Sequence, residues 1–203
     1  LAKPQITRGE RKAVDRVLKS LSLAQGPEVK GFESEFSKFV ADRECVAVNS
    51  GTSALHLCLI ALGLGPGDEV IVPSFTFAAT ANVVALVGAT PVFVDIDPST
   101  YCINPSLVEA AISSKTKAII VVHLYGLPAD MVSISKIAKE HSLLVIEDAA
   151  QAHIASIEDK MVGTLGDAAA FSFYPTKNMT SGEGGMAVLS DANHARTCRL
   201  LRN

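Results

Sequence analysis

The sequence predicts an α/β fold, in which one doubly wound, mostly parallel sheet has helices on both of its faces. Short runs rich in Val and Ile recur along the 203 residues, and such runs are typical of parallel strands that are buried on both faces. Segments with helical spacing alternate with these runs, as they do in doubly wound sheets. The length suffices for one domain with a well-buried core, so we expect residues 1–203 to form a single domain.

Two amphipathic helices are expected before the first strand. The segment from Thr7 to Glu10 fits a capping box, and apolar residues follow it at helical spacing as far as Leu21. Pro27 opens a second helix, one face of which carries three phenylalanines, the last of them Phe39. We expect both helices to pack against the rest of the protein.

Seven strands are expected after these helices, and turn or capping residues bound each of them. They span residues 45–48, 70–72, 92–94, 118–122, 143–146, 168–173 and 186–189. The helices between them are expected at residues 54–62, 78–87, 105–112 and 130–141. Asn104 is expected to cap one of these helices, and Ser190 or Asp191 to cap a last one. The irregular segment 151–166 is expected to include a short hairpin around Asp159 and Lys160.

Composition excludes several classes of protein. The net charge is −3 and no basic tract is present, so neither a nucleic-acid surface nor an anionic-membrane surface is indicated. No apolar run has the 18 or more residues that a membrane helix needs. The four cysteines are widely spaced and form no CxxC pair, which favours reduced thiols and a cytoplasmic protein. No cluster of His, Cys and carboxylate residues has metal-ligand spacing, so no metal is expected.

The segment from Ser50 to Ser53, which reads SGTS, is a candidate anion site. It lies between a predicted strand and a helix N-terminus, where glycine permits close approach and free N–H groups and the helix dipole favour a phosphate. It matches neither a Walker A loop nor a Rossmann GxGxxG. The alternative is that Ser50 or Thr52 only caps the helix.

Two further candidates follow other strands at the same edge of the sheet, where ligands of doubly wound sheets bind. Asp148 ends an apolar strand, so we expect its carboxylate to be partly buried and therefore paired, for example with a protonated ring nitrogen. The alternative is a capping or surface acid beside Glu147. Phe77 lies in a loop where its ring can stack on a flat ligand, and ordinary core packing is the alternative.

Lys177 lies in a loop between two apolar strands, two residues after Pro175 and shortly before the glycine-rich segment from Gly182 to Gly185. A partly desolvated lysine is a usable nucleophile for Schiff-base chemistry. The alternative is a solvated lysine beside a glycine turn. An anion site, a buried carboxylate, a stacking aromatic ring and a Schiff-base lysine are together the groups that hold pyridoxal 5′-phosphate, which we therefore expect as the cofactor.

Five segments carry a resemblance to a known family. They are SGTSALHL (50–57), GPGDEVIVPSFTFAATAN (65–82), GATPVFVDID (88–97), EDAAQAH (147–153) and GDAAAFSFYPTKNMTSGEGGM (166–186). These segments closely resemble the DegT/DnrJ/EryC1/StrS family of pyridoxal-phosphate-dependent nucleotide-sugar aminotransferases. The resemblance implies the large domain of the aspartate-aminotransferase fold (fold type I). It also implies that the C-terminal small domain is absent and that the chain is part of something longer.

The resemblance assigns a role to each candidate. Lys177 resembles the lysine that forms the internal aldimine and moves protons, and Asp148 resembles the partner of the pyridine nitrogen. Gln151 resembles the family glutamine near the ring hydroxyl, and Phe77 resembles the aromatic residue that stacks on the ring. Glu183 is expected near the substrate. The expected phosphate contacts are Gly51, Thr52 and Ser172, with Ser53 as a weaker candidate.

By resemblance, the expected reaction transfers an amino group from an amino-acid donor, glutamate in particular, to a keto group of a nucleotide-linked sugar, in a homodimer. A sugar dehydratase of the same family is one alternative, but it uses a histidine in place of Lys177. A truncated, non-catalytic domain that supports a partner chain is the other. The histidines His123 and His153 are expected to be satisfied polar residues. Ile154 and Ser156 stand where the family has small residues, so we expect a displaced loop there.

Overall fold

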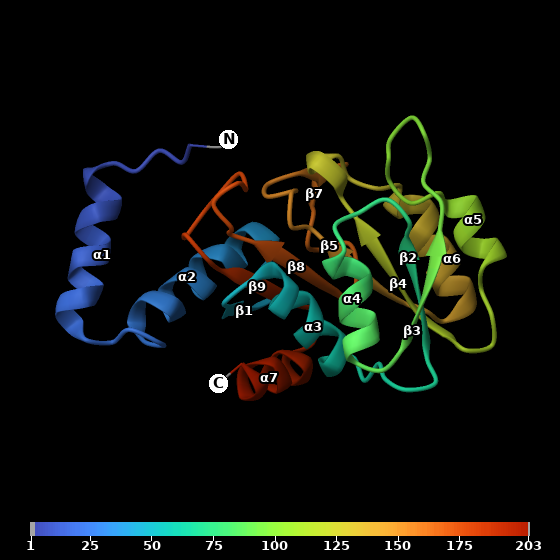
Figure 1. Cartoon of the computed structure of the whole chain (residues 1–203), viewed down its shortest axis with the longest axis horizontal. Coiled ribbons are helices and arrows are strands. Elements are labelled where there is room, and N and C mark those ends of the chain that lie inside the picture. Colours follow the sequence, from blue (N-terminus) through green and yellow to red (C-terminus); the bar gives the residue numbers. More distant parts are fainter. Residues whose placement is uncertain (1–2, 203) are drawn as a thin grey trace.

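The computed structural model describes residues 3–202. Residues 1, 2 and 203, at the ends of the predicted domain, lie outside the described residues. Figure 1 shows a central sheet with helices on both faces and one helix, α1 (Arg8–Ser20), at the far end of the molecule. The predicted α/β class is confirmed.

The main sheet has seven strands, and four of its six strand pairs are parallel. In spatial order the strands are β1 (Glu44–Val48), β9 (Gly185–Leu189), β8 (Ala168–Ser172), β5 (Leu144–Asp148), β4 (Thr116–Val122), β2 (Glu69–Pro73) and β3 (Thr90–Val94). Strand β9 is antiparallel to both of its neighbours. The predicted hairpin is also present, as β6 (Ser156–Ile157) and β7 (Lys160–Met161).

Helices cover both faces of this sheet. Besides α1 they are α2 (Pro27–Ser37), α3 (Gly51–Ala61), α4 (Ala79–Leu86), α5 (Pro105–Ala110), α6 (Met131–His141) and α7 (Ala192–Leu201), with short 3-10 turns η1 (Lys38–Val40) and η2 (Leu124–Gly126). The capping box at Thr7 and the cap at Asn104 are confirmed. Asp191, rather than Ser190, caps α7, which ends at Leu201.

Alternation along the strands divides the core into two layers. On β4, Ile120 packs with residues of α3, α4 and α7 on one face, whereas Ile119 and Val121 pack with residues of α5 and α6 on the other. At the β1 end, Phe36 of α2 and Phe171 of β8 belong to a third cluster. Burial of each large aliphatic or aromatic side chain contributes about 1.5–3 kcal/mol, and the resulting core holds the strand ends in fixed positions.

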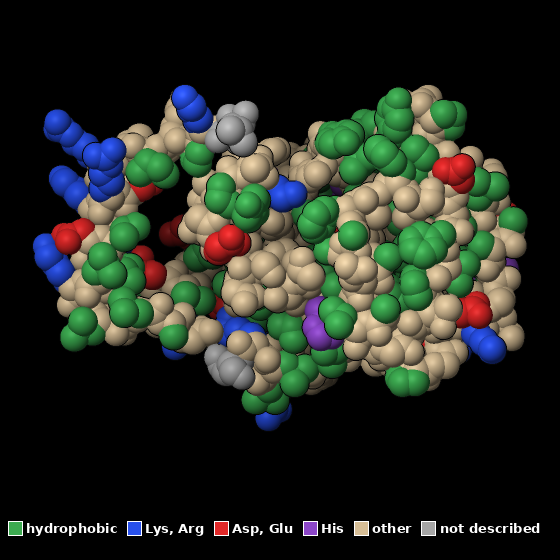
Figure 2. Space-filling view, viewed as in Figure 1, with side chains coloured by type: hydrophobic (Ala, Val, Ile, Leu, Met, Phe, Trp, Pro, Cys, Tyr) green, Lys and Arg blue, Asp and Glu red, His purple; other side chains and the backbone are tan. Residues whose placement is uncertain are grey.

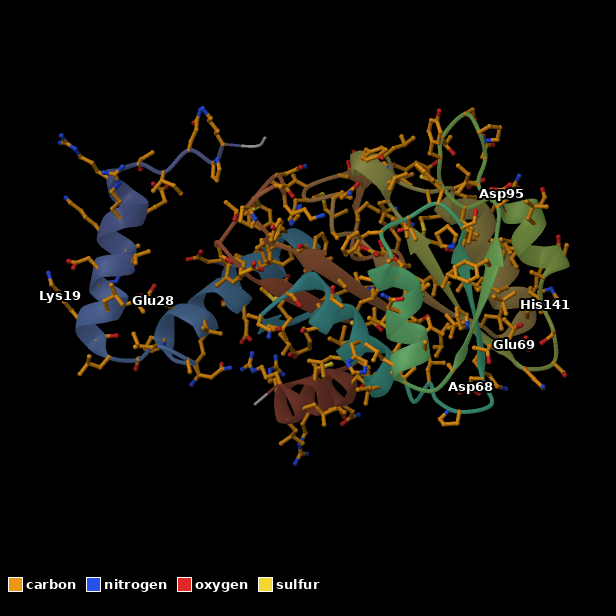
Figure 3. All side chains as sticks on the ribbon, in the orientation of Figure 1. Lys19, Glu28, Asp68, Glu69, Asp95 and His141 are labelled. Carbon is orange, nitrogen blue, oxygen red and sulfur yellow. The ribbon has the colours of Figure 1, made fainter. Side chains whose placement is uncertain are left out.

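The carboxyl ends of β1, β2, β3, β4, β5 and β8 share one edge of the sheet. Figure 3 shows the two edges, with Glu69 where β2 begins and Asp95 just after β3 at the opposite edge. Strand β9 begins at the same edge with Gly185, where a Cβ atom would lie 2.2 Å from the carbonyl oxygen of Ser50. Glycine is therefore required for β9 to start against the N-terminus of α3.

Two expectations about packing are wrong. Helix α1 has no buried residue, and its Val14 and Leu18 are exposed. Figure 2 shows its apolar side chains on the side toward the rest of the molecule and most of its basic side chains on the outer side. Phe39 lies in η1 rather than on the α2 face and is 53% exposed. Hydrophobic periodicity predicts that a helix has an apolar face, but it does not show which other part of the protein covers that face.

Candidate active site

A cavity of about 580 Å³ opens at the carboxyl edge of the sheet. Its walls come from the start of α3, the loop before α4, the loop after β5, and the loop that joins β8 to β9. It brings together seven of the nine predicted site residues: Gly51, Thr52, Phe77, Gln151, Ser172, Lys177 and Glu183. Asp148 and Ser53 do not line it. The segments that meet here extend from Ser50 to Gly184 in the sequence, so the fold itself assembles the cavity.

The N-terminus of α3 forms one end of the cavity. Ser50 caps the helix by accepting a hydrogen bond of 3.1 Å from the N–H of Ser53. The first-turn N–H groups of Gly51 and Thr52, which have no intrahelical acceptor, remain as donors beside the hydroxyl of Ser172. A Cβ atom on Gly51 would lie 2.8 Å from Cβ of Ser172, so glycine permits this approach. Ser50 therefore caps the helix, as the alternative interpretation of this segment predicted. The N–H groups of Gly51 and Thr52 are also present as the donors that an anion site needs.

Asp148 lies at the end of β5 and is 9% exposed, so it is a buried residue rather than a surface acid. Its Oδ2 accepts a hydrogen bond of 2.8 Å from the hydroxyl of Thr80, and its Oδ1 accepts one of 3.2 Å from the N–H of Ala150. Burial raises the pKa of Asp148, although these hydrogen bonds and the charge of Lys177 oppose the rise. A carboxyl group in this environment favours a cationic partner.

The loop that carries Lys177 is closed at its base by backbone hydrogen bonds. Phe173 donates its N–H to Gly184 and accepts from the N–H of Ser181, at 2.8 and 3.1 Å. The N–H of Lys177 donates to the carbonyl of Tyr174 at 2.9 Å, which makes a turn directly after β8. Lys177 is partly buried and lines the cavity. The amine is thus carried by a short, closed loop between two buried strands.

Phe77 and Gln151 line the cavity from two other loops. Phe77 is 74% exposed, so its ring is not core packing and is available to a ligand. The side-chain oxygen of Gln151 accepts a hydrogen bond of 2.8 Å from the N–H of Tyr125. Because that oxygen is engaged, the amide N–H groups of Gln151 are left as donors for whatever occupies the cavity.

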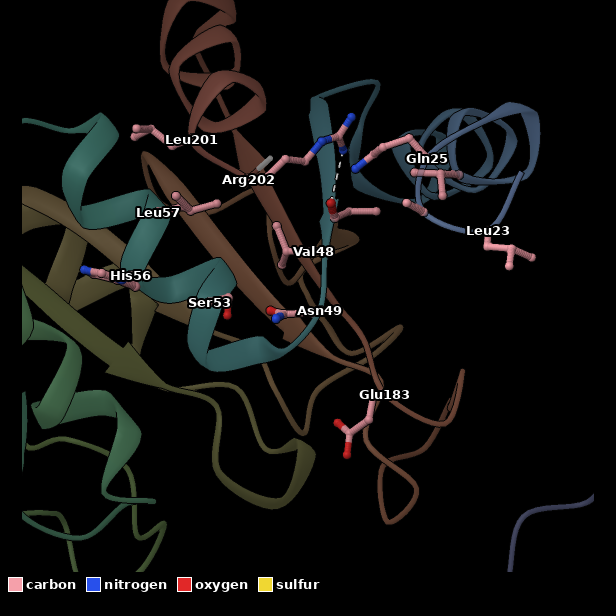
Figure 4. Close-up of a pocket in the computed structure, with 13 residues that line it drawn as sticks. Leu23, Gln25, Val48, Asn49, Ser53, His56, Leu57, Glu183, Leu201 and Arg202 are labelled. Carbon is pink, nitrogen blue, oxygen red and sulfur yellow. Dashed lines mark hydrogen bonds between the residues drawn. The ribbon is translucent and has the colours of Figure 1, made fainter. Parts of the chain in front are cut away.

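A second cavity of about 620 Å³ lies on the other side of the α3 N-terminus (Figure 4). Ser53 lines this cavity instead of the first, and its N–H and hydroxyl both contact the Ser50 side chain. Glu183 is exposed and lines both cavities. The dashed line in Figure 4 is the hydrogen bond of 3.1 Å from Arg202 to the carbonyl of Ala47.

His123 is a satisfied core residue, as expected. It is fully buried, and its Nδ1 accepts a hydrogen bond of 3.1 Å from the N–H of Ala129, so its Nε2–H donates to Glu147 at 3.1 Å. For His153 the expectation is wrong: the residue is buried, neither of its ring nitrogens has a hydrogen-bond partner within residues 3–202, and its ring packs against Phe171 and Phe173 at 5.5 and 5.3 Å. Burial lowers the pKa of His153, so this histidine is held neutral.

Sequence reasoning missed two contributors to the site. Thr80 lies within the helix predicted at residues 78–87, and its side chain holds Asp148. The available signal was a threonine four residues after Thr76 in an otherwise apolar first turn. The backbone N–H of Tyr125 orients Gln151, and this role cannot be recognised from the residue type because every residue except proline has a backbone N–H. Among residues 3–202, no group of three or more His, Cys, Asp or Glu could hold a metal ion.

Comparisons with known proteins agree with this geometry. Residues 4–203 match the DegT/DnrJ/EryC1/StrS aminotransferase family. A "Pleiotropic regulatory protein" of Geobacillus stearothermophilus is 49% identical over 98% of this chain and 53% of its own length. The GDP-perosamine synthase of Caulobacter vibrioides is 48% identical over 100% of this chain and 55% of its own length. The chain therefore spans about half the length of the curated relatives it matches.

Solved structures give the same result. An aminotransferase from Psychrobacter cryohalolentis superposes with a TM-score of 0.93 at 42% identity, over 98% of this chain and 52% of that one. NtdA from Bacillus subtilis with bound cofactor PMP superposes with a TM-score of 0.88 at 38% identity, over 98% of this chain and 47% of that one. The aminotransferase-like α/β fold expected from the sequence is confirmed by these similarities.

Proposed function

The chain belongs to the DegT/DnrJ/EryC1/StrS aminotransferase family, and from this premise we propose that it binds pyridoxal 5′-phosphate and acts as the cofactor-binding large domain of a sugar aminotransferase. The domain comprises residues 1–203. The observation that carries the proposal is the cavity that the Lys177 loop, the α3 N-terminus and Phe77 line together with Ala150, which donates its N–H to the buried Asp148.

The residues present fit this cofactor. Asp148 is buried, and the ion pairs among the described residues do not include it, so a protonated ring nitrogen would supply the missing cation. The N–H groups of Gly51 and Thr52 and the hydroxyl of Ser172 suit a phosphate. Gly51 also leaves open the space that a Cβ atom would fill against Ser172.

Each side chain then has a specific task. When bound, the cofactor accepts the electron pair released at the substrate carbon, provided that its ring nitrogen stays protonated. Asp148 would keep that nitrogen protonated, Gln151 would donate to the ring hydroxyl, and Phe77 would cover one face of the ring. Lys177 takes up and returns protons through its amine.

The proposed substrates are a nucleotide-linked keto sugar and an amino-acid donor, glutamate in particular. The name of the GDP-perosamine synthase relative supports the sugar. Glu183 is proposed to contact substrate, because it is exposed at the mouth of the cavity. Lys177 also disfavours the dehydratase alternative, which requires a histidine there.

Spectroscopic titration of the chain with pyridoxal 5′-phosphate tests the proposal. We expect a visible absorption band that borohydride bleaches and that the variant Lys177→Ala lacks. Lys160→Ala, which removes an exposed lysine of β7, is the matched control and should keep the band. A band that persists in Lys177→Ala would contradict the assignment of the lysine.

Addition of glutamate separates catalysis from mere binding. A catalytic domain converts the band to the spectrum of the amino form of the cofactor. A band that glutamate leaves unchanged would favour the non-catalytic alternative, in which the chain supports a partner. The absence of any band would contradict cofactor binding itself.

We also propose that the chain forms a homodimer in the cytoplasm. The large exposed apolar side chains Phe77 and Tyr125, which are 74% and 75% exposed, support an interface near the cavity. All four cysteines are free and buried, which suits a reducing compartment. No helix within residues 3–202 has the length and apolar character to cross a membrane. Light scattering after size exclusion should give twice the chain mass, and a monomer at high concentration would contradict the dimer.

A further inference from the structure

Thr80 is a fully buried polar residue in the first turn of α4. Its hydroxyl lies 2.8 Å from Oδ2 of Asp148 and 3.0 Å from the hydroxyl of Thr76. A hydroxyl group has one proton to donate, and an ionised carboxylate can only accept. Thr80 therefore donates to Asp148 and accepts from Thr76. The three side chains form one directed chain of hydrogen bonds that ends on the carboxylate.

The same threonine also fixes a second part of the site. Its backbone N–H donates to the carbonyl of Phe77 at 3.1 Å. One residue thus binds Asp148 through its side chain and Phe77 through its backbone. The carboxylate that would face the ring nitrogen comes from strand β5, the ring that would stack on the cofactor comes from the loop before α4, and Thr80 connects them directly.

Both oxygens of Asp148 are held, each from a different element. Oδ2 is held from α4 by Thr80, and Oδ1 is held by the N–H of Ala150, which follows β5. Two donors on two oxygens fix the plane of the carboxylate. Because an ionised carboxylate has about four acceptor positions, the remaining positions are free for a ring N–H.

We propose that Thr80 is a positioning residue of the cofactor site: it holds Asp148 ionised and correctly oriented toward the ring nitrogen, and it ties that carboxylate to the Phe77 loop. This inference rests on the proposed function for its purpose, but the contacts belong to the chain itself. The titratable groups that face Asp148 are Lys177, from the loop after β8, and His123, which directly follows β4. Thr80 is the side chain that donates a hydrogen bond directly to it.

A carbon-13 NMR titration of aspartate carboxyl groups in the cofactor-free chain measures this effect. Because a hydrogen bond to a charged group contributes about 1.5–3 kcal/mol, we expect Thr80→Val to move the titration midpoint of Asp148 at least about one pH unit higher. Thr80→Ser keeps the hydroxyl and should return the midpoint to its original position. Thr76→Val should move it by a smaller amount in the same direction.

Three outcomes would overturn the inference: an unchanged midpoint in Thr80→Val, a midpoint in Thr80→Ser as high as that in Thr80→Val, or no shift in Thr76→Val. Thr80→Ala replaces Thr80→Val if the valine variant does not fold. Thr197→Val, which removes a helix hydroxyl on α7 that donates to Asn193, is the matched control and should leave the midpoint unchanged.

Titration with pyridoxal 5′-phosphate provides the second readout. Thr80→Val should bind it about tenfold more weakly than the unmodified chain, whereas Thr80→Ser should bind as the unmodified chain does. Equal affinity in Thr80→Val would contradict the role of Thr80 toward the cofactor. If the unmodified chain does not bind the cofactor, the proposed function fails, and the NMR titration still decides whether Thr80 controls Asp148.

Discussion

At the scale of single residues, the two adjacent carboxylates at the end of β5, Glu147 and Asp148, have pKa values that are shifted in opposite directions. Successive side chains of a strand point to opposite faces, so Glu147 and Asp148 enter different layers. Glu147 accepts hydrogen bonds from three backbone N–H groups and from His123. Burial tends to raise the pKa of Glu147, but these hydrogen bonds outweigh it and hold the pKa below its ordinary value. For Asp148 burial prevails, and its pKa is raised.

Glu147→Gln should therefore destabilise the protein. The amide would set N–H donors against the N–H groups of Gly163 or Leu165, which lie 2.8 Å from the carboxylate oxygens. We expect the free energy of unfolding at pH 7 to fall by about 2–4 kcal/mol, as measured by urea denaturation. Glu140→Gln, at an exposed position of α6, is the control and should change it by less than about 0.5 kcal/mol.

The lowered pKa of Glu147 also predicts that the stability of the protein depends on pH. Because the folded pKa of Glu147 lies below its unfolded value of about 4.3, ionised Glu147 stabilises the fold above that pH. The stabilisation is lost as the pH falls through the folded pKa. The stability difference between the unmodified chain and Glu147→Gln should therefore shrink in acid. A difference that stays constant down to the acid transition would contradict this account.

Ile154, in the loop that the resemblance predicts to be displaced, has a strained backbone conformation. Its φ is 63°, a left-handed conformation that is rare for a β-branched side chain, and the side chain is 63% exposed. Ile154→Gly should relieve the strain and raise the free energy of unfolding by about 1 kcal/mol. Val132→Gly, at an exposed position of helix α6, should lower it by about 1 kcal/mol. Equal losses in both variants would show that Ile154 is not strained.

At the scale of elements, the contact between α3 and β8 decides whether the anion site exists. Gly51→Ala would place Cβ 2.8 Å from Cβ of Ser172 and 3.3 Å from its Cα, so the helix must move away from the strand. We expect the free energy of unfolding to fall by about 1–3 kcal/mol, and the binding of pyridoxal 5′-phosphate to weaken.

Gly31→Ala is the matched control, because a Cβ there has no neighbour within 4 Å and the residue lies inside α2. It should stabilise the protein by about 0.5–1 kcal/mol and leave cofactor affinity unchanged. Urea denaturation and cofactor titration of both variants check the pair. If Gly51→Ala bound the cofactor as tightly as Gly31→Ala, the close approach of α3 and β8 would not matter for the site.

The order and type of the elements were predictable from the sequence, because the hydrophobic periodicity of each segment agrees with the turn and capping residues at its ends. The ends were less so: β5 continues through Glu147 and Asp148, where polar residues suggested that the strand had stopped. Thr80 was missed for a related reason. A threonine in a helix of small residues carries no local sign of its partner, because that partner lies 68 residues away.

At the scale of the whole molecule, the candidate site depends on the complete sheet. The cavity is lined by segments that extend from Ser50 to Gly184, and they are adjacent only because six strands end at one edge. The sequence could place each segment at a strand end, and the parallel-sheet rule then placed them together. What covers the exposed apolar face of α1 could not be predicted, because a pattern along one helix does not specify its partner.

A site made of distant segments should bind its ligand only in the folded state, and this gives a prediction for the whole chain. Pyridoxal 5′-phosphate at 100 times its dissociation constant should raise the free energy of unfolding by about 2.7 kcal/mol. The dependence of that free energy on urea concentration should be unchanged, because the surface exposed on unfolding is the same. Circular dichroism during urea denaturation, with and without cofactor, measures both quantities. Lys177→Ala and Gly51→Ala should gain less at the same cofactor concentration, and equal gains in all three proteins would show that the cofactor stabilises the fold from a place other than this cavity.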